Sequence, residues 1–393
     1  MSGARTRSWD DPVLDRMDSA LAGILVAPGP VPSVAVLAAA VGVDESRLGA
    51  LFQVHVHAAP ETFLRRASIR AACLHLVAGG AARDLDAQAF RRETGLSPDA
   101  YRALLATGRF ELALPPDFRA ADLLRFHGRD AQSVSERVEG TTLRKAYLAE
   151  GQPAVLNLAF GDGRVAVSLE GGPGTRSAFA GAHAASLRLL GWHGDPGPFE
   201  AAHPHLARGR EGLRIPLTLD PFEALVWAIV GQQVNLAFAY ALRRDLIRLA
   251  GLPAGHGLIA HPDPAHLATL APEALQALRF SRRKAEYLIG AAQAVAGGRL
   301  CLEALPTATG AARELLALRG CGTWTAQYVL MRGLGFGDCV PLGDAALTLA
   351  LQRAFSLPER PDAAATARLL APFTPHRSLA TFHLWASLKG IPA

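Results

Sequence analysis

Leu318-Arg319-Gly320-Cys321-Gly322-Thr323-Trp324-Thr325-Ala326 is the stretch on which the interpretation of this chain of 393 residues depends. It is typical of the end of a helix, a turn built on two glycines and the start of a second helix. The glycines let the backbone turn tightly and approach a ligand, and the first N–H groups of the next helix suit a phosphate. Taken alone, the pattern is more often a plain turn between helices.

A second short segment, Pro341-Leu342-Gly343-Asp344-Ala345-Ala346-Leu347, follows the two-glycine turn and places an acid at the opening of an apolar helix. An aspartate in this position is most often an N-cap, whose side chain accepts a hydrogen bond from the first turn. A fixed carboxylate can also stabilise a cationic transition state and activate water. The two uses are compatible, and the residues alone leave both open.

Apolar residues at helical spacing surround these segments from about residue 206 to the end. We expect helices near 221–230, 235–249, 264–277, 281–296, 309–318, 324–333, 344–355, 362–371 and 377–388. The Pro-, Gly- and His-rich stretch 194–212 is expected to be a linker. Residues 206–393 are therefore predicted to form an all-α domain around the helix-hairpin-helix segment.

Residues 109–205 have a different pattern, with short runs of β-prone residues. Strands are expected at 110–114, 143–148, 154–160 and 165–169, and helices near 118–129 and 175–190. Gly161-Asp162-Gly163 is predicted to be a hairpin turn, because Asp-Gly tolerates the positive φ of a tight reversal. This segment is predicted to be a small α+β domain around an antiparallel sheet.

The first 108 residues are helical throughout in their pattern. Residues 36–48 are typical of a helix-turn-helix, with Gly42 in the turn and Asp44 as the cap of the second helix. The expected fold class is therefore multidomain and mainly α, with domains at 1–108, 109–205 and 206–393.

The amino-acid composition excludes several classes of function. Half of the residues are hydrophobic, and the formal net charge of +5 permits nucleic acid as a partner without demanding it. Four cysteines without a CxxC pair exclude the usual four-thiolate zinc and iron-sulfur sites, and no metal site is predicted. A polar N-terminus and the absence of a run of ~18 apolar residues predict a cytoplasmic protein with no membrane contact.

Lysine is rare in this chain. Only Lys145, Lys284 and Lys389 are candidates for a Schiff base mechanism. Lys284, in Arg282-Arg283-Lys284-Ala285-Glu286, is expected on a solvated helix face.

Four ordered motifs carry a resemblance to a known family: AIVGQQVN at 228–235, LRGCGTWTAQYVL at 318–330, PLGDAAL at 341–347 and RSLATFHLW at 377–385. Together they resemble the helix-hairpin-helix superfamily of DNA glycosylases, in particular the DNA-3-methyladenine glycosylase II (AlkA-like) branch, over about 112–393. The resemblance implies a central domain like the TATA-binding protein. It also implies a bacterial, nucleoid-associated monomer that flips alkylated bases of the 3-methyladenine and 7-methylguanine class from duplex DNA and hydrolyses the N-glycosidic bond in base excision repair.

The resemblance also assigns residues. Asp344 matches the catalytic acid. A pocket for a cationic base is expected from four aromatic residues, because electron-rich rings favour a cation by about 1–2 kcal/mol: Trp324, Tyr328, Trp385 and Phe126. The DNA contacts are expected at Gln233, Arg319, Gly320, Gly322 and Thr323, with Gln233 as the wedge that fills the vacated stack. No cofactor is implied beyond a monovalent cation at the hairpin.

Trp324 bears on the reaction type. It stands where lyase-type relatives carry a lysine nucleophile, so a monofunctional enzyme without strand cleavage is expected. The alternative for the rings is an ordinary core role. The alternative for Gln233 is a polar residue at a helix junction, with Asn235 capping the next helix.

Residues 34–56 and 90–105 resemble an AraC-type DNA-binding domain of the adaptive-response regulators. The chain between Gly80 and Phe90 is too short for the first helix of a second helix-turn-helix. Two alternatives for the whole protein stay open: a DNA-binding regulator with a non-catalytic glycosylase half, and a glycosylase for uracil, hypoxanthine or an oxidised purine.

Overall fold

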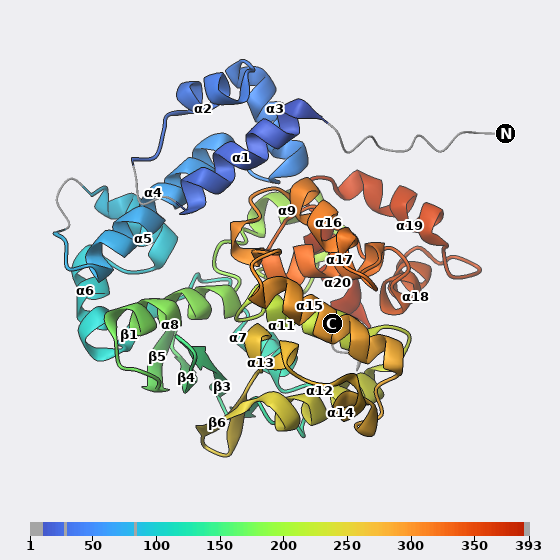
Figure 1. Ribbon diagram of the computed structural model, residues 1–393. Coiled ribbons are helices and arrows are strands. Elements are labelled where there is room, and N and C mark those ends of the chain that lie inside the picture. Colours follow the sequence, from blue (N-terminus) through green and yellow to red (C-terminus); the bar gives the residue numbers. More distant parts are fainter. Residues whose placement is uncertain (1–10, 27–29, 82–84, 389–393) are drawn as a thin grey trace.

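The computed structural model describes residues 11–26, 30–81 and 85–388. The polar N-terminal decapeptide and Lys389 lie outside these ranges. The molecule is mainly helical with one five-stranded antiparallel sheet (Figure 1). None of the helices in the described part is long and apolar enough to cross a membrane.

The N-terminal region contains α1(Pro12–Val26), α2(Val34–Val41), α3(Glu45–His55), α4(Pro60–Val77), α5(Ala87–Thr94) and α6(Pro98–Thr107). The predicted helix-turn-helix pair corresponds to α2 and α3. Gly42 adopts φ +79° between them, and Asp44 Oδ1 accepts a hydrogen bond of 2.7 Å from Arg47 N. α1 to α3 enclose a small core with the start of α4, whereas the end of α4 packs with α5 and α6 against the sheet.

The central sheet has the strand order β1-β5-β4-β3-β2, with every neighbouring pair antiparallel. Its elements are β1(Arg109–Ala113), α7(Ala120–His127), β2(Glu136–Glu139), β3(Thr142–Ala149), β4(Gln152–Gly161), β5(Arg164–Gly171) and α8(Arg176–Leu189). The four predicted strands and both predicted helices are present, and Gly163 turns the β4–β5 hairpin at φ +67°. β2 was not predicted, because its four residues, Glu-Arg-Val-Glu, carry a single apolar side chain.

The prediction of a linker at 194–212 is wrong. It contains two short helices, α9(Gly197–Ala202) and α10(Pro204–Ala207). Phe199 is fully buried and Leu206 is nearly so, and both belong to the core of the C-terminal region. Proline in the first turn of each helix made the stretch resemble a linker, although proline is well tolerated there.

The C-terminal region begins with α11(Pro221–Gly231), α12(Leu236–Ala250), β6(Leu252–Gly255), β7(Leu258–Ala260), α13(Pro264–Ala268), α14(Pro272–Ala277) and α15(Arg282–Ala296). The single helix expected at 264–277 is two helices, because the residue before Pro272 is forced into an extended conformation. The β6–β7 hairpin was not predicted. Its Leu258 and Ala260 pack against the sheet residues Ala146 and Val155.

The remaining elements are η1(Leu302–Ala304), α16(Ala308–Ala317), α17(Thr323–Val329), η2(Leu330–Leu334), α18(Ala345–Ala354), α19(Ala363–Leu370), η3(Ala371–Phe373) and α20(Arg377–Ser387). The helix expected at 324–333 changes into the π-helical turn η2 after Val329. α16, the two-glycine turn and α17 form the predicted helix-hairpin-helix.

The N-terminal region contacts the C-terminal region directly (Figure 1). Asp15 pairs with Arg313 at 2.9 Å, and His55 Nδ1 lies 2.7 Å from Thr309 Oγ1. Asp338 N donates to His57 Nδ1 at 3.1 Å, and the His57 ring meets Phe336 edge-on. These contacts place α1 to α3 against the same side of the molecule as α16.

Candidate active site

An open cleft of about 1070 Å³ lies where the helix-hairpin-helix meets α11, α12, α18 and α20. Its walls come from segments far apart in sequence: the end of α11 with the turn to α12, the two-glycine turn, α17 and the start of α18. The lining includes Gln233, Gly320, Gly322, Trp324, Tyr328, Asp344 and Trp385. The cleft therefore gathers seven of the ten predicted site residues.

Asp344 lines this cleft as the N-cap of α18. Its Oδ1 accepts a hydrogen bond of 2.7 Å from Leu347 N. The same oxygen accepts from Trp385 Nε1 at 3.0 Å, and Oδ2 accepts from Trp324 Nε1 at 3.0 Å. An indole N–H is a donor only, so the two rings hold the carboxylate in one orientation. Asp344 is both a cap and a carboxylate presented to the cleft.

The aromatic wall consists of Trp324, Tyr328 and Trp385. Trp324 and Tyr328 are stacked, with ring centroids 5.6 Å apart and an interplanar angle of 27°. Tyr328 and Trp385 are tilted at 42° with centroids 6.4 Å apart. Tyr328 and Trp385 are also part of the buried core, so a packing role and a place on the cleft wall coexist in these side chains.

The two-glycine turn requires glycine at one position and is open at the other. Gly320 has φ +86°, and a β-carbon there would lie 2.2 Å from the Tyr287 ring. Gly322 has an ordinary φ of −89°, and a β-carbon there would meet open space. No side-chain cap covers the start of α17, and Gly322 and Thr323 are exposed. The backbone of this turn is therefore accessible from the cleft.

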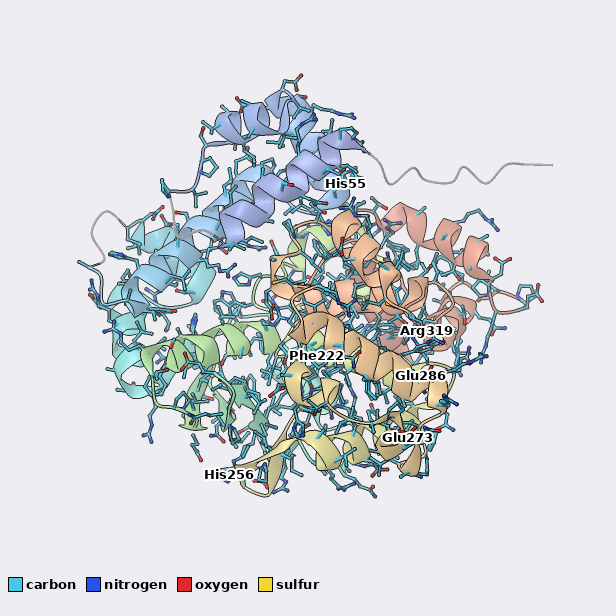
Figure 2. The ribbon with its side chains drawn as sticks, in the orientation of Figure 1. His55, Phe222, His256, Glu273, Glu286 and Arg319 are labelled. Atoms are coloured by element: carbon cyan, nitrogen blue, oxygen red, sulfur yellow. The ribbon has the colours of Figure 1, made fainter. Side chains whose placement is uncertain are left out.

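Arg319 lies on the outer side of the turn. Its guanidinium carbon is 5.9 Å from the centroid of the Tyr287 ring, and Nη1 is 3.5 Å from Glu286 Oε2. Figure 2 labels Arg319 and Glu286, which lie next to each other. Arg319 does not line the cleft, and its side chain is 78% exposed.

The turn from α11 to α12 carries both glutamines of the GQQVN motif. Gln233 is exposed at the rim of the cleft with φ +55°, a conformation that costs a non-glycine residue about 1–3 kcal/mol. Gln232 also lines the cleft, and its Nε2 donates to Gly320 O and Thr325 Oγ1, each at 2.9 Å. Gln232 was not predicted as a site residue, yet it ties this turn to the two-glycine turn. Asn235 caps α12 through a hydrogen bond of 2.9 Å to Phe238 N.

The solvated position expected for Lys284 is wrong. Its side chain is buried, and Nζ donates to Val230 O at 2.8 Å and to Gln232 O at 3.0 Å. Burial lowers the pKa of its ammonium group. The lysine satisfies carbonyl groups at the end of α11 and so fixes the turn that presents Gln233.

Phe126 does not line the cleft, which departs from its expected place in the pocket. It lies on a small cavity behind Tyr328, where the guanidinium carbons of Arg129 and Arg332 are 3.6 and 4.4 Å from its ring centroid. A ring already covered by two cations is not available for stacking on a base. Neither arginine was predicted. Arg332 follows an apolar run that masks it, and Arg129 follows a helix end with no motif.

A buried ionic cluster joins the sheet to α11 and α12 behind the cleft. Glu223 Oε1 accepts from Lys145 Nζ at 2.8 Å and from Arg243 Nη2 at 2.9 Å. Lys145 Nζ also donates to Glu136 Oε2 at 3.1 Å. Burial would raise the pKa of Glu223, but the two cations outweigh it and lower it to about 2. The cluster fixes the position of the sheet relative to the cleft.

Metal-binding clusters of three or more His, Cys, Asp or Glu side chains do not occur within the described ranges. The four cysteines are free. The chemical groups offered by the cleft include a carboxylate, aromatic rings, amide side chains, the guanidinium of Arg129 and backbone N–H groups.

Sequence comparison connects this site to known proteins. A family model described as HhH-GPD superfamily base excision DNA repair protein matches residues 226–375. A DNA-3-methyladenine glycosylase of Bacillus subtilis is 35% identical over 187 residues, which cover 46% of this chain and 62% of that protein. DNA-3-methyladenine glycosylase 2 of Escherichia coli is 36% identical over 148 residues, 37% of this chain and 52% of that protein. The chain thus spans less than two thirds of the length of these relatives.

A third relative is named as a probable bifunctional transcriptional activator/DNA repair enzyme AlkA of Mycobacterium tuberculosis. It is 35% identical over 182 residues, 45% of this chain and 36% of that protein.

Structural comparison agrees with the sequence comparison. The 3-methyladenine DNA glycosylase of Archaeoglobus fulgidus has a TM-score of 0.61 at 19% identity, over 70% of this chain and 97% of that one. The apo-form of a Clostridium acetobutylicum 8-oxoguanine glycosylase/lyase has a TM-score of 0.56 at 15% identity, over 70% and 95%. Residues 226–375 thus match the HhH-GPD superfamily of base excision DNA repair proteins, within a fold shared with DNA glycosylases.

Proposed function

We propose that this protein is a monofunctional DNA glycosylase that removes alkylated bases from duplex DNA. The observation that carries the proposal is the Asp344 carboxylate, held between the N–H groups of Trp324 and Trp385 on the wall of an open aromatic cleft. The sequence relatives named as 3-methyladenine glycosylases support the substrate class. A Clostridium acetobutylicum neighbour solved with double-stranded DNA supports DNA as the partner.

The proposed reaction begins with a nucleotide turned out of the duplex into the cleft. Gln233, exposed at the rim in a strained conformation, is the proposed wedge that occupies the vacated stack. The exposed turn at Gly320 and Gly322 approaches the phosphate backbone, a contact that positions DNA without sequence preference. A monovalent cation at the turn carbonyls would strengthen that contact.

The chemical step in this proposal belongs to Asp344. As the bond between base and sugar breaks, the sugar acquires oxocarbenium character, and a fixed carboxylate stabilises that charge. The same carboxylate orients and deprotonates the water that attacks the sugar carbon. Because both carboxylate oxygens already accept hydrogen bonds, little reorganisation is needed when the charge forms.

The lysines support hydrolysis rather than a lyase reaction. Trp324 stands at the proposed nucleophile position of the lyase-type enzymes. Within the described ranges, the lysines are Lys145, buried in the ionic cluster, and Lys284, whose Nζ donates to two carbonyl groups. We therefore expect no covalent adduct with DNA when borohydride is added during the reaction.

The decisive experiment incubates the purified chain with duplex DNA treated with a methylating agent and identifies the released bases by chromatography. Release of 3-methyladenine or 7-methylguanine, with intact strands until alkali is added, is the expected outcome. Unmethylated duplex is the matched control. Strand cleavage without alkali would contradict the monofunctional reaction, and absence of any released base would contradict the function.

A second candidate function rests on α2 and α3, whose arrangement is that of a helix-turn-helix. In this alternative the chain is a DNA-binding regulator and its C-terminal region only holds DNA. The regulator would be favoured if the protein released no more base than a control without protein and selected one duplex sequence from a random pool. The orientation of Asp344 by two indoles favours the enzyme.

A further inference from the structure

A small cavity of about 30 Å³ lies directly behind the cleft. Arg129, Trp227, Tyr240 and Tyr328 line both spaces, so the cavity adjoins the cleft along these four side chains. Its volume accommodates about one water-sized group.

The wall of the cavity is electropositive. Four cationic side chains line it together with two carboxylates: Lys145, Arg129, Arg243, Arg332, Glu136 and Glu223. Both carboxylates are engaged by Lys145 and Arg243. Burial lowers the pKa of His127, so this neighbour is neutral at pH 7. The other two cationic side chains on the wall are Arg129 and Arg332.

Arg332 is the buried donor of this cavity. It is 2% exposed, and its Nε donates to Pro216 O at 2.9 Å. Its Nη1 is buried and has no hydrogen-bond partner among the described residues. A buried donor left without an acceptor costs about 1–3 kcal/mol, so the site as it stands is incomplete. An acceptor atom entering the cavity would complete it.

Arg129 stands at the junction of the cleft and the cavity. Its guanidinium lies over the Phe126 ring, next to Arg332, and it donates a hydrogen bond to the Tyr240 hydroxyl oxygen. A guanidinium group donates readily to the oxygen of a guanine ring and finds no acceptor in an amino group, which is itself a donor. The two arginines thus distinguish bases by the atom turned toward them.

We infer, on the basis of the proposed function, that the cavity formed by Arg129 and Arg332 receives the exocyclic carbonyl oxygen of the flipped base. The site then favours purines with an oxygen at position 6, such as 7-methylguanine and hypoxanthine. It disfavours 3-methyladenine, which carries an amino group at that position. The aromatic wall supplies stacking for either base, and the arginines supply the selection.

An excision assay tests this inference in the full chain. Duplex DNA methylated to contain both lesions is incubated with the wild-type protein and with Arg129→Gln, and the initial rates of release of the two bases are compared. Loss of a charge-assisted hydrogen bond lowers the ratio of 7-methylguanine to 3-methyladenine release by about tenfold. Arg125→Gln, which changes an exposed arginine on α7, leaves the ratio unchanged. An unchanged ratio in Arg129→Gln, or an equal fall for both bases, overturns the inference.

Arg332→Met provides a second variant, since methionine fills a similar space without a donor. The same fall in the ratio is expected, with circular dichroism at the wild-type level. If this variant does not fold, Arg129→Gln alone decides.

A binding measurement separates this inference from the proposed function. Free hypoxanthine and free adenine are titrated into the protein while the fluorescence of Trp324 and Trp385 is followed. Half-maximal quenching is expected at about tenfold lower concentration for hypoxanthine, and Arg129→Gln removes the difference. Equal quenching by both bases overturns the inference even if excision is found. Selective quenching without excision retains the inference and contradicts the proposed function.

Discussion

α3 and α18 begin in the same way and have different surroundings. In each, an aspartate in an extended conformation caps the helix, and its Oδ1 accepts from the backbone N–H three residues on at 2.7 Å. Asp44 is exposed, whereas Asp344 also accepts two indole N–H groups inside the cleft. The local sequence therefore determines the cap, while partners distant in sequence determine what the carboxylate can do.

The largest expected effect separates capping from chemistry at Asp344. Asn caps a helix about as well as Asp, so Asp344→Asn retains the start of α18 and changes the free energy of unfolding by less than about 1 kcal/mol. The neutral amide neither stabilises an oxocarbenium ion nor deprotonates water, and we expect excision of methylated bases to fall by about a hundredfold or more. Single-turnover kinetics and urea unfolding measure the two effects.

The matched control is Asp362→Asn. Asp362 caps α19 through Ala365 N at 2.7 Å and is exposed. Its variant should match the wild type in excision. Equal activity of the Asp344 and Asp362 variants would reduce Asp344 to a cap.

Features that depend on contiguous residues could be predicted from the sequence, whereas contacts between distant residues could not. The two-glycine turn, Asp344 and the three cleft rings lie in short sequence motifs, and the structure brings these residues together on the wall of one cleft. Lys284 was misplaced because its charged neighbours are typical of a solvated face, while its acceptors belong to α11, more than fifty positions earlier. Arg332 was missed because the π-helical turn that buries it has no marker in the sequence.

The sheet and the connecting segments show the same limit. β3, β4 and β5 were predicted from their apolar runs. β2 is held mainly by pairing with β3, from Glu136 opposite Lys145 to Glu139 opposite Thr142, and the β6–β7 hairpin is held by the sheet edge it packs on. Elements that owe their conformation to a neighbour carry little signal of their own.

A smaller effect is expected from the indoles that distinguish Asp344 from Asp44. Trp324→Phe and Trp385→Phe each remove one N–H donor to the carboxylate and retain most of the ring packing. Loss of a hydrogen bond to a charged group costs about 1.5–3 kcal/mol, so we expect excision to slow by about tenfold to a hundredfold. Trp192→Phe, which removes a donor to Arg92 O far from the cleft, serves as the control. Wild-type rates in both cleft variants would show that the indoles do not orient Asp344.

The contact between the N-terminal and C-terminal regions contains His57, whereas no histidine occurs among the described residues that line the cleft. We therefore expect the stability of this contact to depend on pH. Burial lowers the pKa of His57 to about 4, although Asp338 opposes the shift. The folded state therefore keeps His57 neutral while the unfolded chain takes up a proton below pH 6.5. The stabilisation is complete above pH 6.5 and is lost as the pH falls toward 4, by about 3 kcal/mol in total.

His57→Asn tests this contribution. Asn tolerates the positive φ of 59° at this position and offers an oxygen to Asp338 N. We expect the decrease in urea midpoint between pH 7.5 and pH 4.5 to be smaller in this variant than in the wild type, with His205→Asn, an exposed site, as the control. Buried His183 and His261, whose pKa values are also lowered to about 4, contribute to the remaining slope. If the urea midpoint of the variant decreased with pH as much as that of the wild type, His57 would not contribute to the pH dependence of stability.

The smallest expected effect compares the glycine turns that precede the two helix starts. Gly322→Ala adds a β-carbon in open space at an ordinary φ, so unfolding should be unchanged. If the turn backbone approaches a phosphate, the added methyl group weakens binding of an abasic duplex by several fold, about 1 kcal/mol, since close approach is what glycine permits. Gly42→Ala should do the reverse: φ +79° strains alanine by about 1 kcal/mol, and binding of the abasic duplex to the cleft is retained. Fluorescence anisotropy measures DNA binding and urea unfolding measures stability in both variants. The phosphate contact is assigned to the α16–α17 turn only if Gly322→Ala weakens binding alone and Gly42→Ala lowers stability alone.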